Sequence, residues 1–441
     1  MKHVHTAWAC AAGIAFGAIW MSGCGAAGPS RCIPPPSPPT TLSGEDRREP
    51  VIASDGGGGL VAVWESLTGG PIEASLRRPS GTWSAAAVLS GPYGRDPVVS
   101  VDPEGRAIAA WQVPLRGDTT AVQVATSDDM DGWSEAASVS TGGTHAREPQ
   151  IAVAGDGTVI LAWRRDTGGG DTVIEVAERG RSGTWTSPRT HSDPGLRSKR
   201  PRLAVAPNGA AALVWEQTVD DQVTVVAATR GADGRWSGPI TLSRGTGDAH
   251  EPDLAVGPTG VATAVWIAET GDTAAVMATT RPETGPWSAP VVIGRGSAVP
   301  YETPRPGRAE TGADVVATAD GRAAAAWTIV AGDHNRAQSA AMGRDGAWTT
   351  PTALSDPDAA ASGVQVVGVA GGLTAASWEE LDAGLIRVRA ARLTVDGVAV
   401  TCSDLTAARA ESGAVRLAGG SAPTAVFVDF NRSRVQVAPI P

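Results

Sequence analysis

The sequence predicts an all-β fold in which a unit of four short strands repeats around a ring, and three observations support this prediction. Tryptophan dominates the aromatic residues, with 15 Trp against 3 Phe and 2 Tyr. Tryptophan also recurs at intervals of about 50 residues, and each interval holds four apolar runs separated by turns rich in Gly, Pro, Asn and Asp. No segment shows the apolar period of an amphipathic helix. Four strands per repeat of this length indicate the blade of a β-propeller.

Two series of tryptophans define the repeating unit. The first series consists of Trp64, Trp111, Trp163, Trp215, Trp266, Trp327 and Trp378. The second series follows about 20 residues later in each unit, as expected for two positions of one repeat, and consists of Trp83, Trp133, Trp185, Trp236, Trp287 and Trp348. The remaining two, Trp8 and Trp20, lie in the N-terminal segment.

The fourth copy illustrates how the strands are assigned. Its strand-like runs begin near Pro201, Ala210, Val223 and Trp236, and Pro-Asn-Gly and Ala-Asp-Gly turns divide them. Proline is tolerated as the first residue of a strand because that position can lack a hydrogen-bond donor. Small side chains suit the crowded inner strands, and we expect Trp215 and Trp236 to fill the wider space between blades farther out.

The number of units predicts eight blades. Their first strands begin around Pro50, Pro97, Pro149, Pro201, Pro252, Asp314, Gln365 and Val415. The last copy is one strand short, and residues 37–43 resemble the outer strand at 350–355. An N-terminal outer strand that completes the last blade would close the ring and remove free sheet edges. We therefore predict one propeller domain over residues 37–441, with a seven-bladed ring and a degenerate extra unit as the alternative.

The N-terminus has the pattern of an export signal, with a basic start, a short apolar run and small residues. The run Met21-Ser22-Gly23-Cys24 resembles the bacterial lipoprotein box, in which the chain is cut before a cysteine that then carries lipid. The resemblance implies a signal peptide at 1–23, lipidation of Cys24 and a Pro-rich tether at 24–36. We expect an exported lipoprotein on the extracytoplasmic face of the cell membrane. Met21 departs from the usual Leu, so secretion without lipid is the alternative.

Two further cysteines, Cys32 and Cys402, lie near opposite ends of the mature chain. Export to an oxidising compartment favours a disulfide between them. Cys402 aligns with the outer strand of the seventh unit, beside the expected closing strand, so this bridge would lock the ring. The alternative is two unrelated thiols.

The turns before the second tryptophan series carry a resemblance to known proteins. Segments such as Gly180-Arg-Ser-Gly-Thr-Trp185 and Gly231-Ala-Asp-Gly-Arg-Trp236 resemble degenerate Asp boxes, the Ser-x-Asp-x-Gly-x-Thr-Trp turns of sialidase-type (BNR) propellers. The resemblance implies a shared fold. In sialidases a Tyr–Glu pair acts as nucleophile and an Asp as acid/base, so Tyr301, Glu302 and Asp96 are the corresponding catalytic candidates. The Phe/Tyr-Arg-Ile-Pro signature of sialidases is absent here.

Charged residues precede the first strand of five consecutive units, at one end of the expected axial channel. The candidate ligand-binding residues there are Arg48, Arg95, Arg147, Arg200 and Glu251, together with Arg305 and Arg308 in a longer, Pro-rich loop. Guanidinium groups at such positions suit carboxylates, phosphates or sugar hydroxyls. The alternative is that each Arg–acid pair caps its own turn and balances its neighbours.

Composition and motifs narrow the functional classes. The formal net charge is −10 with both signs interspersed, so we expect no nucleic-acid partner. The six His show no metal-ligand spacing, and we expect no metal or other cofactor. The sequence favours a monomeric, non-catalytic, surface-anchored propeller that binds a glycan or a cell-surface protein and contacts the membrane only through its lipid. A sialidase-like glycoside hydrolase or lyase is the alternative.

Overall fold

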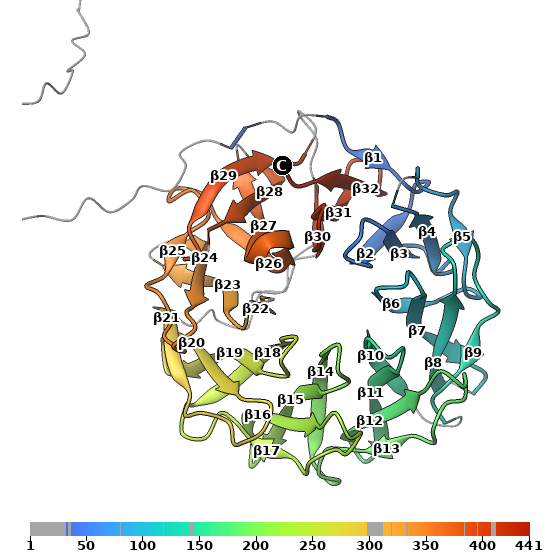
Figure 1. Cartoon of the computed structure of the whole chain (residues 1–441), viewed down its shortest axis with the longest axis horizontal. Coiled ribbons are helices and arrows are strands. Elements are labelled where there is room, and N and C mark those ends of the chain that lie inside the picture. Colours follow the sequence, from blue (N-terminus) through green and yellow to red (C-terminus); the bar gives the residue numbers. More distant parts are fainter. Residues whose placement is uncertain are drawn as a thin grey trace, which may run out of the picture.

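The computed structural model describes residues 32–33, 37–79, 81–117, 119–141, 145–297, 312–318, 320–331, 334–382, 384–394, 396–406 and 412–441. The described residues form eight four-stranded antiparallel blades around a central axis, in the order of the sequence (Figure 1). Single residue pairs link β12 to β14 and β21 to β23, which joins two pairs of adjacent blades into continuous sheets. The predicted eight-bladed propeller is confirmed.

The innermost strands of blades 1 to 8 surround the axis (Figure 1). They are β2 (Arg47–Ser54), β6 (Arg95–Val101), β10 (Ala146–Val153), β14 (Arg197–Val205), β18 (Asp248–Val256), β22 (Ala313–Ala317), β26 (Ala361–Val369) and β30 (Ser412–Ala418). The second strands are β3 (Leu60–Ser66), β7 (Ala107–Leu115), β11 (Val159–Gly168), β15 (Ala211–Val219), β19 (Ala262–Thr270), β23 (Ala323–Ala331), β27 (Leu373–Asp382) and β31 (Thr424–Asp429). A 3₁₀ turn, η1 (Ala370–Gly372), joins β26 to β27.

The third strands lie farther from the axis. They are β4 (Glu73–Arg77), β8 (Thr119–Ser127), β12 (Asp171–Arg179), β16 (Gln222–Arg230), β20 (Thr273–Arg281), β24 (His334–Met342), β28 (Leu385–Leu393) and β32 (Arg434–Pro439). Most outer strands are short: β5 (Ala87–Val88), β9 (Ala137–Ser138), β13 (Arg189–Thr190), β17 (Ile240–Thr241), β21 (Val291–Ser297), β25 (Thr352–Ala353), β29 (Ala399–Asp404) and β1 (Thr40–Thr41).

The ring closes where the two ends of the described chain meet. β1 pairs with β32, so an N-terminal strand completes the eighth blade as predicted. Just before it, Ile33 pairs in parallel with Ser403 of β29, and the predicted disulfide joins Cys32 to Cys402. The N-terminal segment therefore holds blades 7 and 8 together by backbone pairing and by a covalent bond.

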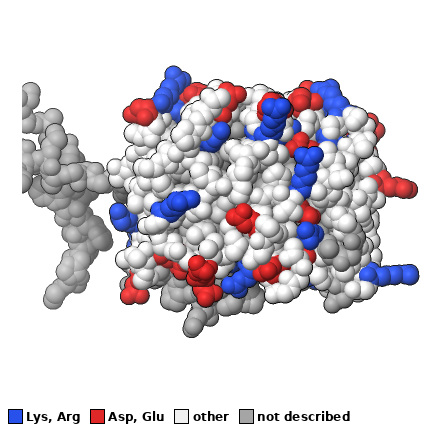
Figure 2. Space-filling model, turned by 90° about the horizontal axis from the view of Figure 1, so that it is seen from below, with Lys and Arg blue, Asp and Glu red and all other residues white. Residues whose placement is uncertain are grey.

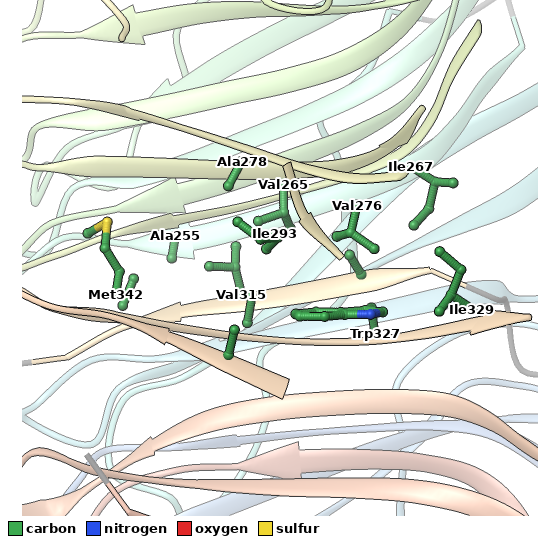
Figure 3. Packing of buried hydrophobic residues seen from close by; sticks show 14 of the residues in the cluster. Ala255, Val265, Ile267, Val276, Ala278, Ile293, Val315, Trp327, Ile329 and Met342 are labelled. Atoms are coloured by element: carbon green, nitrogen blue, oxygen red, sulfur yellow. The ribbon is translucent and has the colours of Figure 1, made fainter. Parts of the chain in front are cut away.

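The first tryptophan series fills the space between blades. All seven of its members lie on second strands and are fully buried. Figure 3 shows Trp327 of blade 6 packed among Val265, Ile293 and Ile329, in a cluster that spans blades 5 and 6. Gly294 of the outer strand makes room for this indole, because a Cβ there would lie 2.8 Å from two of its ring carbons. Burial of such side chains stabilises the ring blade by blade.

In blades 1 to 6, hydroxyl groups attach the outer part of the blade to its third strand. The residue after each tryptophan of the second series is Ser or Thr, and its side-chain oxygen accepts a backbone N–H of the third strand at 3.0–3.1 Å. These residues are Ser84, Ser134, Thr186, Ser237, Ser288 and Thr349. Such bonds compensate for the few ladder bonds that two-residue outer strands can make.

Charge is spread over the outer wall of the ring. Lys and Arg alternate with Asp and Glu over the side seen in Figure 2, as the interspersed sequence pattern predicts. Among the residues that the structure describes, no helix is long and apolar enough to cross a membrane. Residues 1–31, with the proposed signal peptide and Cys24, lie outside the described part of the chain.

Candidate functional site

A β-bulge near the start of the innermost strands shapes one end of the axial channel. In blade 1, Arg48 lies opposite Glu65 and Val51 opposite Val63, so two residues face Trp64 alone. The first residue of the bulge has a positive φ of 46–55° in blades 1 to 5. These residues are Glu49, Asp96, Glu148, Arg200 and Glu251, and we call this set the channel mouth. The left-handed backbone re-aims each side chain away from the regular strand direction.

Buried carboxylates hold the bulges in place across blade boundaries. Glu65, Glu216 and Glu379 each follow a tryptophan of the first series and are at most 2% exposed. Each accepts the backbone N–H of the bulge in the next blade, from Asp96 at 2.9 Å, Glu251 at 2.8 Å and Ala414 at 2.6 Å, respectively. The bulge amides are thereby satisfied by the preceding blade, which couples neighbouring blades at the channel mouth.

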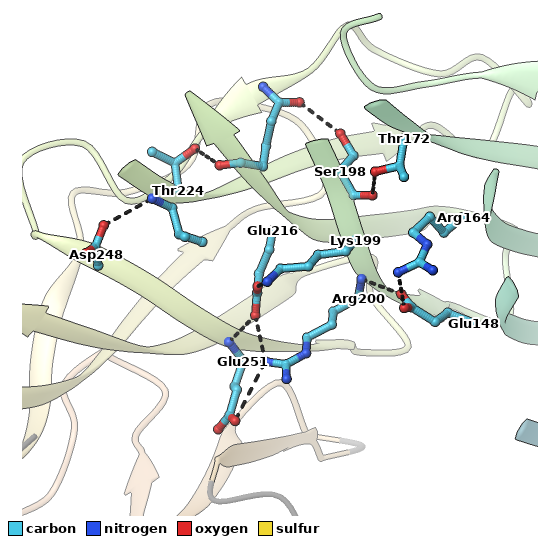
Figure 4. A network of polar contacts seen from close by, with 12 residues as sticks. Glu148, Arg164, Thr172, Ser198, Lys199, Arg200, Glu216, Thr224, Asp248 and Glu251 are labelled. Carbon is cyan, nitrogen blue, oxygen red and sulfur yellow. Dashed lines mark hydrogen bonds and ion pairs between the residues drawn. The ribbon is translucent and has the colours of Figure 1, made fainter. Parts of the chain in front are cut away.

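Three of the four predicted arginines that the structure describes pair with these buried carboxylates. Arg48 Nε lies 2.5 Å from Glu65 Oε1, and Arg95 Nη1 lies 3.8 Å from the same oxygen. Glu216 lies between two cations (Figure 4). Its Oε1 is 3.1 Å from Arg200 Nη1, and its Oε2 is 3.3 Å from Lys199 Nζ. Arg200 also lies 3.7 Å from Glu251. The guanidinium groups thus stabilise the mouth.

Blade 3 has no acid after its tryptophan, and its link to the next blade is made by other residues. Arg164 occupies the position that Glu65 and Glu216 hold in their blades, and it donates to Glu148 Oε1 at 2.6 Å. The other oxygen of Glu148 accepts the backbone N–H of Arg200 at 2.7 Å (Figure 4). The predicted residue Arg147 points elsewhere, with Nη2 3.3 Å from His145 Nδ1. Glu148 therefore links blade 3 to blade 4 although its blade lacks the buried acid.

Glu49 and Asp96 are the most accessible acids of the mouth. Asp96 remains in contact with solvent while the surrounding blades enclose it. Its desolvation, followed by the nearby carboxylates of Glu148 and Glu49, raises the pKa of Asp96. Burial likewise raises the pKa of Glu65, against the opposing effects of the Asp96 amide and Arg48. A carboxyl with a raised pKa keeps its proton to a higher pH than an exposed Asp or Glu does.

The remaining catalytic and ligand-binding candidates from the sequence belong to the long Pro-rich loop. Tyr301, Glu302, Arg305 and Arg308 lie outside the described residues. Within the described ranges, no group of three or more His, Cys, Asp and Glu side chains could hold a metal ion. Among the described residues, the channel mouth is thus an arc of carboxylates beside the paired guanidinium groups of Arg48, Arg95 and Arg200.

Deeper in the ring, two innermost strands bring carboxyl groups together. Asp253 of β18 and Asp314 of β22 share a side-chain hydrogen bond, which requires a proton between them. Asp253 also accepts the Val315 N–H at 2.9 Å, and Asp314 accepts the Val366 N–H at 2.8 Å. Burial, and then the charge of Asp253, raises the pKa of Asp314 well above its ordinary value.

This carboxyl pair leads to a pH-dependent prediction. Because the pKa of Asp314 is raised in the folded state, the folded chain binds this proton more tightly than the unfolded chain. Stability from this pair is present at low pH and is lost as pH rises through the raised pKa. Asp314→Asn supplies a permanent donor to Asp253, so we expect it to stabilise the protein at about pH 8 by about 1–3 kcal/mol.

The measurement is guanidinium unfolding of both proteins across pH. The gain should vanish at about pH 3, where the Asp314 carboxyl is protonated in the folded wild type. Asp345→Asn, in an exposed turn where the side chain accepts the Ala347 N–H, is the matched control and should change stability little at either pH. A gain of equal size at both pH values would contradict the shared proton.

The buried acids were the functional feature that sequence reasoning missed. The signal was present as the dipeptide Trp-Glu at Trp64, Trp215 and Trp378. Alternation along a strand places the residue after a buried tryptophan on the opposite face of the sheet, which in a propeller is also buried. A repeated acid at a buried position indicates a fixed partner, here the bulge of the next blade.

Comparisons with known proteins agree with this fold. No protein-family model matches the chain, and no curated protein does. Among solved structures, the chain is similar to the BP39L lectin from Burkholderia pseudomallei, with a TM-score of 0.55 and 17% identity over 80% of this chain and 97% of the lectin. It is also similar to an ulvan lyase of polysaccharide lyase family PL25, determined bound to -[GlcA(1-4)Rha3S]-, with a TM-score of 0.50 and 11% identity over 83% of this chain and 96% of the lyase. The likeness shows the fold.

Proposed function

We propose that the protein is a non-catalytic, surface-anchored propeller that binds a glycan at its channel mouth. The observation that carries this proposal is the arc formed by Glu49, Asp96, Glu148, Arg200 and Glu251, in which four carboxylates and one guanidinium group lie on bulged strands of five consecutive blades. Because the arginines are already paired with carboxylates, this surface suits the hydroxyl groups of a sugar better than a free anion. A lectin and a polysaccharide lyase among the structures of similar fold support a glycan as ligand.

The proposed location follows from the two ends of the chain. Cys24 would carry lipid and residues 24–36 would form the tether. The Cys32–Cys402 disulfide is of the kind that persists in oxidising compartments outside the cytoplasm. Metabolic labelling with a palmitate analogue tests the anchor, and labelling that survives Cys24→Ala would contradict it.

A glycan array probed with soluble protein from Arg31 to Pro441 tests the binding function. We expect selective retention of a subset of glycans, weakened about tenfold by Arg95→Ala, since this side chain is half-exposed and its ion pair is long. Arg235→Ala is the matched control, because Arg235 lies in an exposed turn between the third and outer strands and should leave binding unchanged. A protein that retains no glycan would contradict the proposal and direct the search to protein partners.

A glycoside hydrolase or lyase is the second candidate. The raised pKa of Asp96 favours it, since a general acid with a raised pKa keeps its proton to a higher pH than an ordinary Asp. In that case Asp96 would protonate the leaving group, and Tyr301 with Glu302 would act as the nucleophile pair. Mass analysis of the retained glycans separates the two functions. Shortened glycans that become intact with Asp96→Asn would establish catalysis, and intact glycans with the wild type would exclude it.

A further inference from the structure

The crevice between blades 3 and 4, at the end of the ring away from the channel mouth, is closed by an ion pair. Arg230 ends the third strand of blade 4, where it pairs in register with Ala211. Its Nε and Nη2 donate to the two carboxylate oxygens of Glu178 in blade 3 at 3.1 and 2.9 Å, and Nη1 donates to the Gly209 carbonyl at 2.6 Å. Trp236 Nε1 also donates to Glu178, at 2.7 Å. The charges of Arg230 and Glu178 therefore compensate each other.

The crevice between blades 2 and 3 has the arginine without the acid. Arg179 pairs with Val159 as Arg230 does with Ala211, so the two arginines occupy the same position of the repeat. The counterpart of Glu178 in blade 2 is Thr126, whose hydroxyl lies 3.4 Å from Ser134 Oγ. Among the described residues, the Arg179 guanidinium has no hydrogen-bond or ion-pair partner. One substitution between repeats therefore leaves a cation uncompensated.

Other blades show how such an arginine can be accommodated. Arg281 of blade 5 faces a threonine in the preceding blade, and its Nη1 donates to the carbonyls of Pro282 and Glu283 in its own turn. Arg77 of blade 1 also lacks a side-chain partner among the described residues, and its Nε is buried. Arg179 differs from both, because it lines a cleft of about 430 Å³, a size found for small-molecule sites.

The cleft has fixed polar walls and an apolar floor. Arg106 is held by Asp102 at 2.6 Å, and Arg181 donates to the Asp156 carbonyl. Both guanidinium groups approach Gly157, where a Cβ would lie 2.9 Å from Arg106 Nη2 and 3.4 Å from Arg181 Nε. The apolar part of the lining consists of Ala107, Ile108, Val153 and Val159. Asp128 also lines the cleft, and no ion pair joins it to Arg179 in the described structure.

We propose that this cleft is a second binding site, which takes the carboxylate of an acidic sugar. The Arg179 guanidinium binds the carboxylate as Arg230 binds Glu178 in the next crevice. The apolar floor receives the C–H face of the sugar ring, and Thr126 and Asp128 bond its hydroxyls. The choice of a sugar rather than another carboxylate rests on the proposed function, whereas the choice of an anion rests on Arg179 alone.

Calorimetric titration of the full-length protein with trigalacturonate tests this site, with the fully methyl-esterified trimer as the neutral control. We expect the wild type to bind the acid at least tenfold more tightly than the ester, which corresponds to about 1.4 kcal/mol. Arg179→Ala should abolish this preference, and Arg179→Lys should retain part of it. Asp128→Asn should strengthen binding of the acid severalfold, because it removes a like charge from the cleft.

The most direct test is a variant that places a carboxylate of the protein itself beside Arg179. Thr126→Glu provides the carboxylate that Glu178 provides in the next crevice, so it should abolish trigalacturonate binding and raise the melting temperature. Thr126→Gln is the matched control of equal length without the charge. It loses the same hydroxyl contact, so it should weaken binding only in part, and it should leave the melting temperature unchanged. If the Thr126→Glu variant binds trigalacturonate with the wild-type affinity, the proposal is overturned.

The outcomes separate this site from the channel mouth. Loss of trigalacturonate binding with Arg95→Ala but not with Arg179→Ala would overturn the cleft site and leave the proposed function intact. Equal binding of acid and ester, or no binding of either, would also overturn the cleft site. Retention of neutral glycans on the array, sensitive to Arg95→Ala, would then still support the mouth as a glycan site.

Discussion

Removal of the Cys32–Cys402 disulfide is expected to destabilise the protein by about 3–5 kcal/mol, because the bond closes a very long loop. The two cysteines are separated by 370 residues, and the bond joins the segment before the closing strand to blade 7. Without it, β1 is held to β32 by two residue pairs and a few flanking bonds. Guanidinium unfolding of Cys32→Ser against the wild type measures the loss.

Chemical reduction provides the matched control for this prediction. Cys32 is half-buried, whereas Cys402 is 3% exposed in the core of blade 7, so replacing Cys32 disturbs less packing. A reductant should lower the stability of the wild type to that of Cys32→Ser and should not affect the variant further. Wild-type stability that does not respond to reductant would contradict a role of the bond in ring closure.

Glu216→Ala is expected to cost about 2–4 kcal/mol, although the residue lies far from any chain end. The side chain is fully buried and accepts from the Glu251 amide at 2.8 Å and from Arg200 at 3.1 Å. Its removal leaves a buried bulge amide without an acceptor and leaves Arg200 and Lys199 without their shared carboxylate. Denaturant unfolding measures the change.

Glu216→Gln separates the two contributions. The amide oxygen of Gln can still accept the Glu251 N–H, while the charge that balances Arg200 is lost. We therefore expect about half the destabilisation of Glu216→Ala. If both variants unfold at the wild-type midpoint, the carboxylate does not couple blades 4 and 5. Because Glu216 supports the bulge at Glu251, Glu216→Ala should also weaken any ligand at the channel mouth, whereas it should leave the cleft at Arg179 unaffected.

The architecture could be predicted because each blade is specified within one repeat. Trp215, its turn and Trp236 follow one another closely in the chain, and ladder pairing between successive strands needs only local turns. The closing strand could be predicted because a missing strand at one terminus matched an extra strand at the other. Even the Cys32–Cys402 bridge followed from this alignment, since Cys402 belongs to the outer strand beside the closure.

The candidate site could be predicted only in part. The charged residues predicted at five consecutive units lie at one end of the ring, as the equivalence of repeats requires, whereas Arg305 and Arg308 lie outside the described residues. Their partners could not be derived, since Arg200 interacts with Glu148, Glu216 and Glu251 from three different blades. Such pairings depend on the twist between blades and on the bulge, neither of which a strand pattern shows.

The repeat pattern in the sequence by itself determined an eight-bladed all-β ring and the place where it closes, because hydrogen bonding within a blade and tryptophan packing between blades recur with the chain. Only the tertiary structure decided which charges are compensated, because the partners lie on different strands of one blade or on neighbouring blades. Glu178 meets Arg230, while Thr126 leaves Arg179 without an acid. Two nearly equivalent crevices therefore differ in charge, and with it in what each can bind.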